Sequence, residues 1–173
     1  MASRLKYRKP RPFNFLLLLL LVCWVAYRLG DFQQNEIPPA SDQQAARVLR
    51  VIDGDTLLID GDRRVRLIGV DTPETKHPKL PPQPFGDEAT QFTVDMVEGR
   101  TVQLVFDKER YDRYQRILAF VFVDDRFLNE ELVAAGLATA EPRYRYRDDF
   151  KKRFIEAEKI AKEKRLGIWS LEP

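Results

Sequence analysis

Two short stretches of this 173-residue chain carry acidic side chains at a spacing that suits chemistry, residues 52–56 (IDGDT) and residues 70–75 (VDTPET). Taken alone, Asp-Gly-Asp is most often a tight turn. Asp-Thr-Pro-Glu is likewise an ordinary turn or helix cap with proline in its second position. Both stretches, however, follow predicted strands, whose rigid ends can hold polar side chains together. We therefore treat the two stretches as halves of one candidate site.

The carboxylates of these stretches predict a site for a hard metal ion. Two neighbouring carboxylates repel each other unless one is protonated or a cation lies between them. Asp55 and Asp71, with a backbone carbonyl nearby, form an oxygen-only ligand set that suits Ca²⁺ or Mg²⁺ rather than zinc. Glu74 follows Asp71 by three residues and is placed to act as a general base on a water at that site.

Two arginines add a function that the carboxylates lack. Arg66 lies on a predicted strand before Asp71, and Arg116 opens another strand. A single arginine is by default a solvated surface residue. A guanidinium nevertheless matches a phosphate through two hydrogen bonds and can stabilise the charge of a pentacovalent transition state. Together these residues predict chemistry at a phosphate.

The composition excludes several other kinds of site. His77 is the only histidine and Cys23 the only cysteine, so multi-histidine metal sites, disulfides and thiolate zinc sites are excluded. Lys and Arg number 29 against 27 Asp and Glu, so bulk charge does not indicate a nucleic-acid binder. Any basic surface must be local. Residues 143–147 (RYRYR) either form such a surface, stacking bases and pairing phosphates, or are a solvated loop.

Five short stretches rich in branched residues predict the strands that position these side chains. They are 48–52, 56–59, 64–69, 102–106 and 117–123, with a hairpin turn at 60–62. Strands of this number and length suit a small closed barrel of the oligonucleotide-binding (OB) type.

Three amphipathic stretches predict the helices that accompany the barrel. They are 86–97, 130–135 with Asn129 as its N-cap, and 150–164 with Ile160 on the inward face. The predicted fold class is therefore α+β, mainly a β barrel with helices: a five-stranded OB-fold barrel plus three helices, preceded by an N-terminal transmembrane helix.

The N-terminal region predicts a membrane anchor. Residues 1–12 contain five cations and precede an apolar stretch, 13–29, that reaches the lower limit of about 17 residues for a membrane span. A buried core helix leaves these cations unexplained, and a cleavable signal peptide lacks a convincing cleavage pattern. An uncleaved signal anchor fits best, followed by a flexible linker at 30–45 and a folded domain at 46–171.

The charge distribution also predicts the orientation of this anchor. Positive charge before the span places residues 1–12 in the cytoplasm and the folded domain on the extracytoplasmic side. We expect a single-pass membrane protein, or a secreted one if the segment 13–29 is cleaved.

Seven separated strings, in the same order along the chain, resemble motifs of the staphylococcal nuclease (thermonuclease) family. They are DGDT at 53–56, the stretch 66–78, FGDEA at 85–89, DRYQR at 112–116, NEELV at 129–133, GLA at 136–138 and LGIWS at 166–170. The resemblance covers residues 46–171 and leaves the N-terminal anchor outside. It implies a five-stranded OB barrel with three helices.

The resemblance implies a role for each acidic residue of the candidate site. Asp55 and Asp71 match the calcium-binding carboxylates, and Thr72 matches the position that offers a backbone carbonyl. Glu74 matches the glutamate that activates water. The implied cofactor is therefore Ca²⁺.

The resemblance also assigns the residues that bind the substrate. Arg66 and Arg116 match the two arginines that grip the phosphate and stabilise the transition state. Arg113 and Tyr114 match a basic and aromatic pair beside the nucleotide, and Tyr144 matches one tyrosine of a base-stacking pair.

The chain departs from the family pattern at two of these places. Gln115 replaces a glycine expected before Arg116, which alters how that arginine is presented. The second base-stacking tyrosine falls at Pro142, where Tyr146 or Arg143 is the candidate replacement.

The family implies a calcium-dependent endonuclease that hydrolyses the 5′ P–O bond of DNA and RNA and leaves 3′-phosphates. No protein partner is implied, and we expect a monomer that contacts the membrane through residues 13–29. The rival reading is a catalytically inactive OB-fold module that binds nucleic acid on a membrane anchor. Such modules lose the metal carboxylates or the phosphate-binding arginines, whereas all of them are present here, which favours an enzyme.

Overall fold

Residues 42–75 and 81–171 are the part of the chain that the computed structural model describes. The predicted basic N-terminus (1–12), the anchor (13–29) and most of the linker (30–45) lie outside these ranges. Among the described residues, none of the helices is both long enough and apolar enough to span a membrane.

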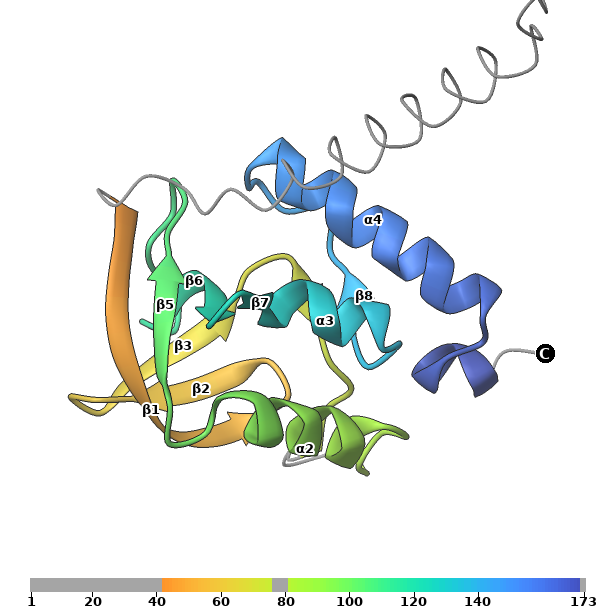
Figure 1. Cartoon of the computed structure of the whole chain (residues 1–173), viewed down its shortest axis with the longest axis horizontal. Coiled ribbons are helices and arrows are strands. Elements are labelled where there is room, and N and C mark those ends of the chain that lie inside the picture. The colour runs from red at the N-terminus through yellow and green to blue at the C-terminus, as the bar shows by residue number, and fades with distance from the viewer. Residues whose placement is uncertain (1–41, 76–80, 172–173) are drawn as a thin grey trace, which may run out of the picture. The chain divides into compact units, whose positions relative to one another are not determined.

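Five strands close into a barrel, as the sequence predicts (Figure 1). They are β1 (Gln43–Asp53), β2 (Thr56–Ile59), β3 (Arg63–Leu67), β5 (Thr101–Val105) and β6 (Ile117–Val123). β1, β2 and β3 form an antiparallel meander that includes the predicted hairpin at 60–62. β5 pairs with β1, β6 pairs with β5, and a parallel pairing of β3 with β6 closes the ring.

β1 is the longest strand because it pairs with two neighbours in succession. Its first residues pair with β5, beginning at Gln43↔Val105, and its later residues pair with β2 as far as Asp53↔Thr56. Two register shifts in the second half have the effect of β-bulges, which bend a strand. The predicted linker (30–45) ends too late, because residues 43–45 already form backbone pairs with β5.

Three helices cover the barrel. α2 (Gly86–Val97) packs on β1, α3 (Leu128–Ala134) packs on β6, and α4 (Asp148–Glu163) packs on α3. Figure 1 shows α3 between the barrel and α4. The short elements are β4 (Val70–Asp71), β7 (Arg126–Phe127), β8 (Thr139–Ala140) and a final 3-10 turn, η3 (Gly167–Leu171).

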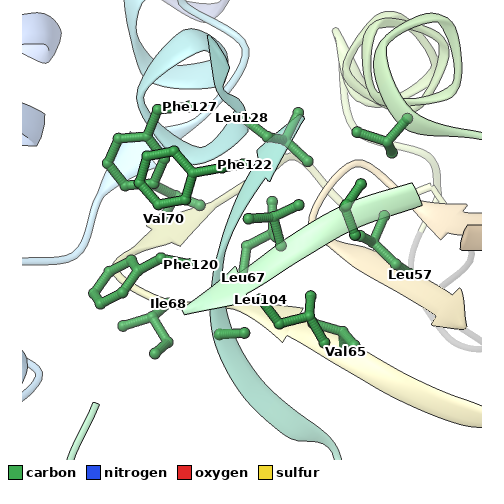
Figure 2. Packing of buried hydrophobic residues seen from close by; sticks show 14 of the residues in the cluster. Leu57, Val65, Leu67, Ile68, Val70, Leu104, Phe120, Phe122, Phe127 and Leu128 are labelled. Atoms are coloured by element: carbon green, nitrogen blue, oxygen red, sulfur yellow. The ribbon is translucent and has the colours of Figure 1, made fainter. Parts of the chain in front are cut away.

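Aromatic rings of β6 and β7 gather at one side of the core, next to aliphatic side chains such as Leu67 and Leu104 (Figure 2). The rings of Phe122 and Phe127 stack with centroids 4.3 Å apart, and Phe120 meets Phe150 edge-on at 4.7 Å. Such pairs contribute about 0.5–1.5 kcal/mol each beyond the area they bury. β6 is therefore a rigid base for Arg116, the residue immediately before it.

Two predictions about the helices are wrong. α3 begins at Leu128 rather than after an Asn129 cap. Asn129 is instead fully buried, where its Oδ1 accepts a hydrogen bond from Val121 N–H (3.0 Å) and its Nδ2 donates to the Ile68 carbonyl (2.9 Å). Ile160 is 40% exposed on the outer side of α4, because the neighbouring Ala157 and Ala161 take the buried positions of that turn.

Candidate active site

The turn between β1 and β2 approaches the loop after β4 so closely that only glycine fits at its first position. A Cβ on Gly54 would lie 2.8 Å from the side chain of Thr72. Thr93 of α2 fixes the same turn by donating a hydrogen bond from its hydroxyl to the Gly54 carbonyl (2.7 Å). The two acidic stretches that the sequence indicates, 52–56 and 70–75, are thus in direct contact.

Asp55 is held rigidly within this contact. It is 6% exposed, and its Oδ1 accepts a hydrogen bond from the Thr56 hydroxyl (3.0 Å). Its Oδ2 accepts the backbone N–H of Thr72 (3.1 Å) and pairs with Arg66 Nη1 (2.8 Å). The Asp55 carbonyl in turn accepts the Leu67 N–H (2.9 Å). These bonds place the carboxylate of Asp55 beside the backbone N–H of Thr72.

Arg66 joins Asp55 to the second acidic residue. Its Nη2 lies 2.6 Å from Asp71 Oδ1, and its Nη1 also donates to the Val70 carbonyl (2.8 Å). The pKa of Asp71 is raised above its usual value. Partial burial raises it most, the charge of Arg66 lowers it, and the charge of Asp55 raises it further. One guanidinium therefore balances two carboxylates that would otherwise repel each other.

The carboxylate oxygens around Arg66 are of the type that a hard cation prefers as ligands. Asp55 and Asp71 each place an oxygen within 2.8 Å of the same guanidinium, so the two oxygens converge on one region. In the two described ranges, no group of three or more His, Cys, Asp or Glu has the arrangement of a metal site. The side chains that converge are two carboxylates, an all-oxygen pair of the kind that suits a hard cation with water or substrate as further ligands.

Asp53 is an additional acidic residue to which the sequence reasoning gave no role. Burial, followed by the charge of Asp55, raises the pKa of Asp53 to about 6. Its Oδ1 is buried without a hydrogen-bond partner in the described part of the chain. A buried carboxylate oxygen with no donor is a feature that a nearby cation would relieve. The Asp-Gly-Asp pattern was the signal that could have found it.

Glu74 lies on the loop between β4 and α2, three residues after Asp71. Its N–H donates to the side-chain oxygen of Gln83 (2.9 Å), and its carbonyl accepts the Gln83 N–H (2.9 Å). After burial and Asp55, the charge of Glu74 is a further cause of the raised pKa of Asp53. The charge of Glu74 therefore reaches these carboxylates, which is the link between Glu74 and the site.

Arg116 is held by a separate turn. Asp112 Oδ1 accepts the N–H groups of Tyr114 (2.8 Å) and Arg116 (2.9 Å), and its Oδ2 accepts Arg116 Nε (2.7 Å). Burial raises the pKa of Asp112, but the hydrogen bonds from Arg116 and Tyr114 prevail and lower it below its usual value. Asp112 is thus a positioning residue that the sequence reasoning missed, although its four-residue spacing from Arg116 is the signal of such a turn.

Tyrosine and arginine side chains stand open beside this turn. Tyr114 is 64% exposed, with the Arg113 guanidinium 4.8 Å from its ring centroid, and Tyr144 is 66% exposed. Tyr146, the candidate replacement for the missing tyrosine, is only 7% exposed and packs against Phe120. Its ring is part of the core and cannot stack on a base.

A cavity of about 680 Å³ brings most of the predicted residues together. Six of the nine line it: Arg66, Asp71, Arg113, Tyr114, Arg116 and Tyr144. Asp55 and Thr72 do not line the cavity. Asp55 pairs with Arg66, which does, and Thr72 donates its N–H to Asp55. Glu74 is not part of the lining and is linked to the site by the charges described above.

Comparison with known proteins identifies the family to which this chain belongs. The family described as Staphylococcal nuclease homologue matches residues 64–171. A thermonuclease of Staphylococcus hyicus is 42% identical over 147 residues, which cover 82% of this chain and 84% of that protein. A thermonuclease of Staphylococcus intermedius is 46% identical over 125 residues, 70% of this chain and 74% of its own. Endonuclease YncB of Bacillus subtilis (strain 168) is 43% identical over 129 residues, 70% of this chain and 59% of that protein. The chain belongs to the staphylococcal nuclease family.

Proposed function

We propose that this protein is a calcium-dependent endonuclease that hydrolyses the 5′ P–O bond of DNA and RNA and leaves 3′-phosphates. The observation that carries the proposal is the meeting of Arg66, Arg116 and Asp71 in the wall of one cavity, with Asp55 directly behind. Relatives named thermonuclease and endonuclease support the reaction class, and the two thermonucleases are above 40% identical over most of their length.

Asp55, Asp71 and the Thr72 carbonyl are the residues that would hold the calcium ion. Bound there, the ion supplies Lewis-acid stabilisation of the charge that develops on the phosphate. Without it, Arg66 balances both carboxylates. If a calcium ion took over this role, the Nη2 of Arg66 that now pairs with Asp71 would become available to a phosphate.

The remaining steps fall to the side chains of the chain itself. Glu74 accepts a proton from the attacking water as the new oxygen–phosphorus bond forms. Arg66 and Arg116 donate hydrogen bonds to the phosphate oxygens, whose charge grows in the transition state. Asp112 holds Arg116 through Nε, so the two Nη groups of that arginine remain for the substrate. The 5′ P–O bond breaks, the 5′ oxygen takes up a proton, and the phosphate stays on the 3′ side.

The exposed rings of Tyr114 and Tyr144 suit the bases next to the cleaved bond. Stacking on an aromatic ring tolerates any base, because every base has a π-face. This mode of binding is consistent with a substrate range that includes both DNA and RNA.

We also propose that residues 13–29 tether the enzyme to a membrane, with residues 1–12 in the cytoplasm and the nuclease domain outside. The support is the cluster of five cations before the apolar stretch. A calcium site of extracellular type, with a Kd of about 10⁻⁴–10⁻³ M, would be filled outside a cell and nearly empty in cytosol. Reporter fusions at the C-terminus test this orientation, and a cytoplasmic signal from them would contradict it.

The nuclease proposal is tested by cleavage of a single-stranded oligonucleotide in calcium and in excess chelator. Activity is expected in calcium alone, with product ends that require a phosphatase before the 3′ end can be extended. Glu74→Gln is expected to abolish most of it, whereas the control Glu163→Gln, on the exposed end of α4, keeps it. Full activity of Glu74→Gln would remove the proposed mechanism, and binding without cleavage by the unmodified protein would favour the inactive module.

A further inference from the structure

Tyr111 is an exposed tyrosine of the cavity wall to which the proposed mechanism gives no role. It is 60% exposed and lines the same cavity as Tyr114 and Tyr144. Among the described residues, no other ring and no cation packs on its ring. By contrast, the guanidinium groups of Arg113 and Arg116 lie 4.8 and 5.5 Å from the centroid of the Tyr114 ring. The faces of Tyr111 are therefore open to a planar ligand.

The backbone that carries Tyr111 is held on both sides. Tyr111 forms a β-bridge with Ile117. On one side of it the Arg110 carbonyl accepts the Leu118 N–H (2.9 Å), and on the other the Asp112 N–H donates to the Arg116 carbonyl (3.0 Å). A ring on such a hairpin loses little conformational entropy when a ligand packs on it. An exposed but anchored aromatic ring is the combination that stacking platforms use.

The charges of the cavity increase the importance of such contacts. Its lining contains five arginines and five carboxylates: Arg66, Arg113, Arg116, Arg143, Arg145, and Asp71, Asp107, Asp112, Glu109, Glu141. A wall with matched charges attracts a polyanion less strongly than a basic groove does. Affinity for a nucleic acid must then depend more on aromatic contacts.

We propose that Tyr111 stacks on a nucleobase beyond the nucleotides that flank the cleaved bond, so that the site binds a longer single-stranded segment than the catalytic residues alone require. The proposal rests on the nuclease function proposed above and extends its substrate contacts by one base. Tyr111 would then supply a base contact in addition to those proposed for Tyr114 and Tyr144 in the same cavity.

The experiment compares Tyr111→Ala and Tyr111→Phe on a dinucleotide-length substrate and on longer single-stranded oligonucleotides. Tyr111→Ala is expected to raise KM for the longer substrates about five- to tenfold, the lower part of the range for one stacked base, with kcat unchanged. It is expected to leave KM for the dinucleotide-length substrate unchanged. Tyr111→Phe keeps the ring and is expected to behave as the unmodified protein.

A scan with abasic nucleotides locates the contact. Each long substrate lacks one base, and one position is expected to raise KM for the unmodified protein but not for Tyr111→Ala. Leu49→Ala is the matched control, since Leu49 is 50% exposed and does not line the cavity. Thermal unfolding of each variant checks that the fold is retained.

An equal change in KM for both substrate lengths would overturn the inference, and so would no change for either. The inference would also be overturned if Tyr111→Phe raised KM for the longer substrates as much as Tyr111→Ala does, because that result would assign the contact to the hydroxyl. If the unmodified protein cleaves neither substrate, the nuclease proposal fails instead. In that case, anisotropy of a labelled oligonucleotide still reports whether Tyr111→Ala weakens binding.

Discussion

Arg116 depends on one carboxylate for its position, and we expect Asp112→Asn to lower turnover by more than its effect on stability explains. Asp112 Oδ1 accepts two backbone N–H groups, and Oδ2 accepts Arg116 Nε at 2.7 Å. An asparagine keeps the first oxygen and therefore the turn. Its amide nitrogen replaces the second oxygen and presents a donor to the guanidinium donor, so Arg116 loses its anchor.

The size of both effects follows from these contacts. A hydrogen bond to a charged group contributes about 1.5–3 kcal/mol, and we expect Asp112→Asn to decrease the free energy of unfolding by an amount in that range. Removing a donor to the transition state costs on the order of 10²–10³ in kcat. Arg116 remains in the variant but is free to rotate, so we expect kcat to fall about tenfold to a hundredfold.

Turnover of a single-stranded oligonucleotide and urea unfolding measure the two effects separately. The control is Asp149→Asn, because Asp149 pairs with Arg147 Nε at the same 2.7 Å but neither residue lines the cavity. We expect the control to lose stability and keep kcat. Since the folded pKa of Asp112 is lowered, its stabilisation is present above the unfolded value of 3.8 and is lost as the pH falls through the folded value. If Asp112→Asn destabilises the protein and retains full kcat, Asp112 does not position Arg116 for catalysis.

Three further outcomes follow from the structure. Gln115→Gly is expected to raise the free energy of unfolding by up to about 1 kcal/mol in urea, because Gln115 has a φ of 62° that glycine adopts without strain; a decrease would contradict this reasoning. Asn129→Ala is expected to lower it by about 2–4 kcal/mol, since the buried Val121 N–H and Ile68 carbonyl lose their partner; a loss below about 0.5 kcal/mol would show that other groups satisfy them. Asp53→Asn is expected to stabilise the protein at pH 7 in chelator. Burial and the charge of Asp55 raise the folded pKa of Asp53 to about 6. The stability that depends on its protonated carboxyl is therefore fully present below the unfolded value of 3.8 and is lost as the pH rises through 6. Urea unfolding at pH 3.5, 5 and 7 checks this, and a variant whose advantage does not grow with pH would refute it.

The barrel was predictable because its strands are short runs of branched residues with turn signals between them. Each stretch named from the sequence overlaps a strand of the structure, and α2 occupies the predicted range. The prediction of an Asn129 cap was wrong because this side chain hydrogen-bonds groups that are distant in the sequence. Asn129 has the residue type of a cap, yet it hydrogen-bonds backbone groups of Val121 and Ile68, and the latter is 61 residues away in the sequence.

Residue types and their spacing were enough to name candidate ligands for a hard cation and candidate arginines for a phosphate, because these proposals depend on the chemistry of side chains at the ends of strands. Which of them meet depended on the closure of the barrel. Arg66 bridges Asp55 and Asp71 only because β2, β3 and β4 place all three at one side of the ring. Tyr144 and Tyr146 stand two residues apart in one loop, and their sequence context does not distinguish them. Packing against Phe120 buries Tyr146 and leaves Tyr144 exposed, a difference that arises from tertiary contacts and not from local sequence.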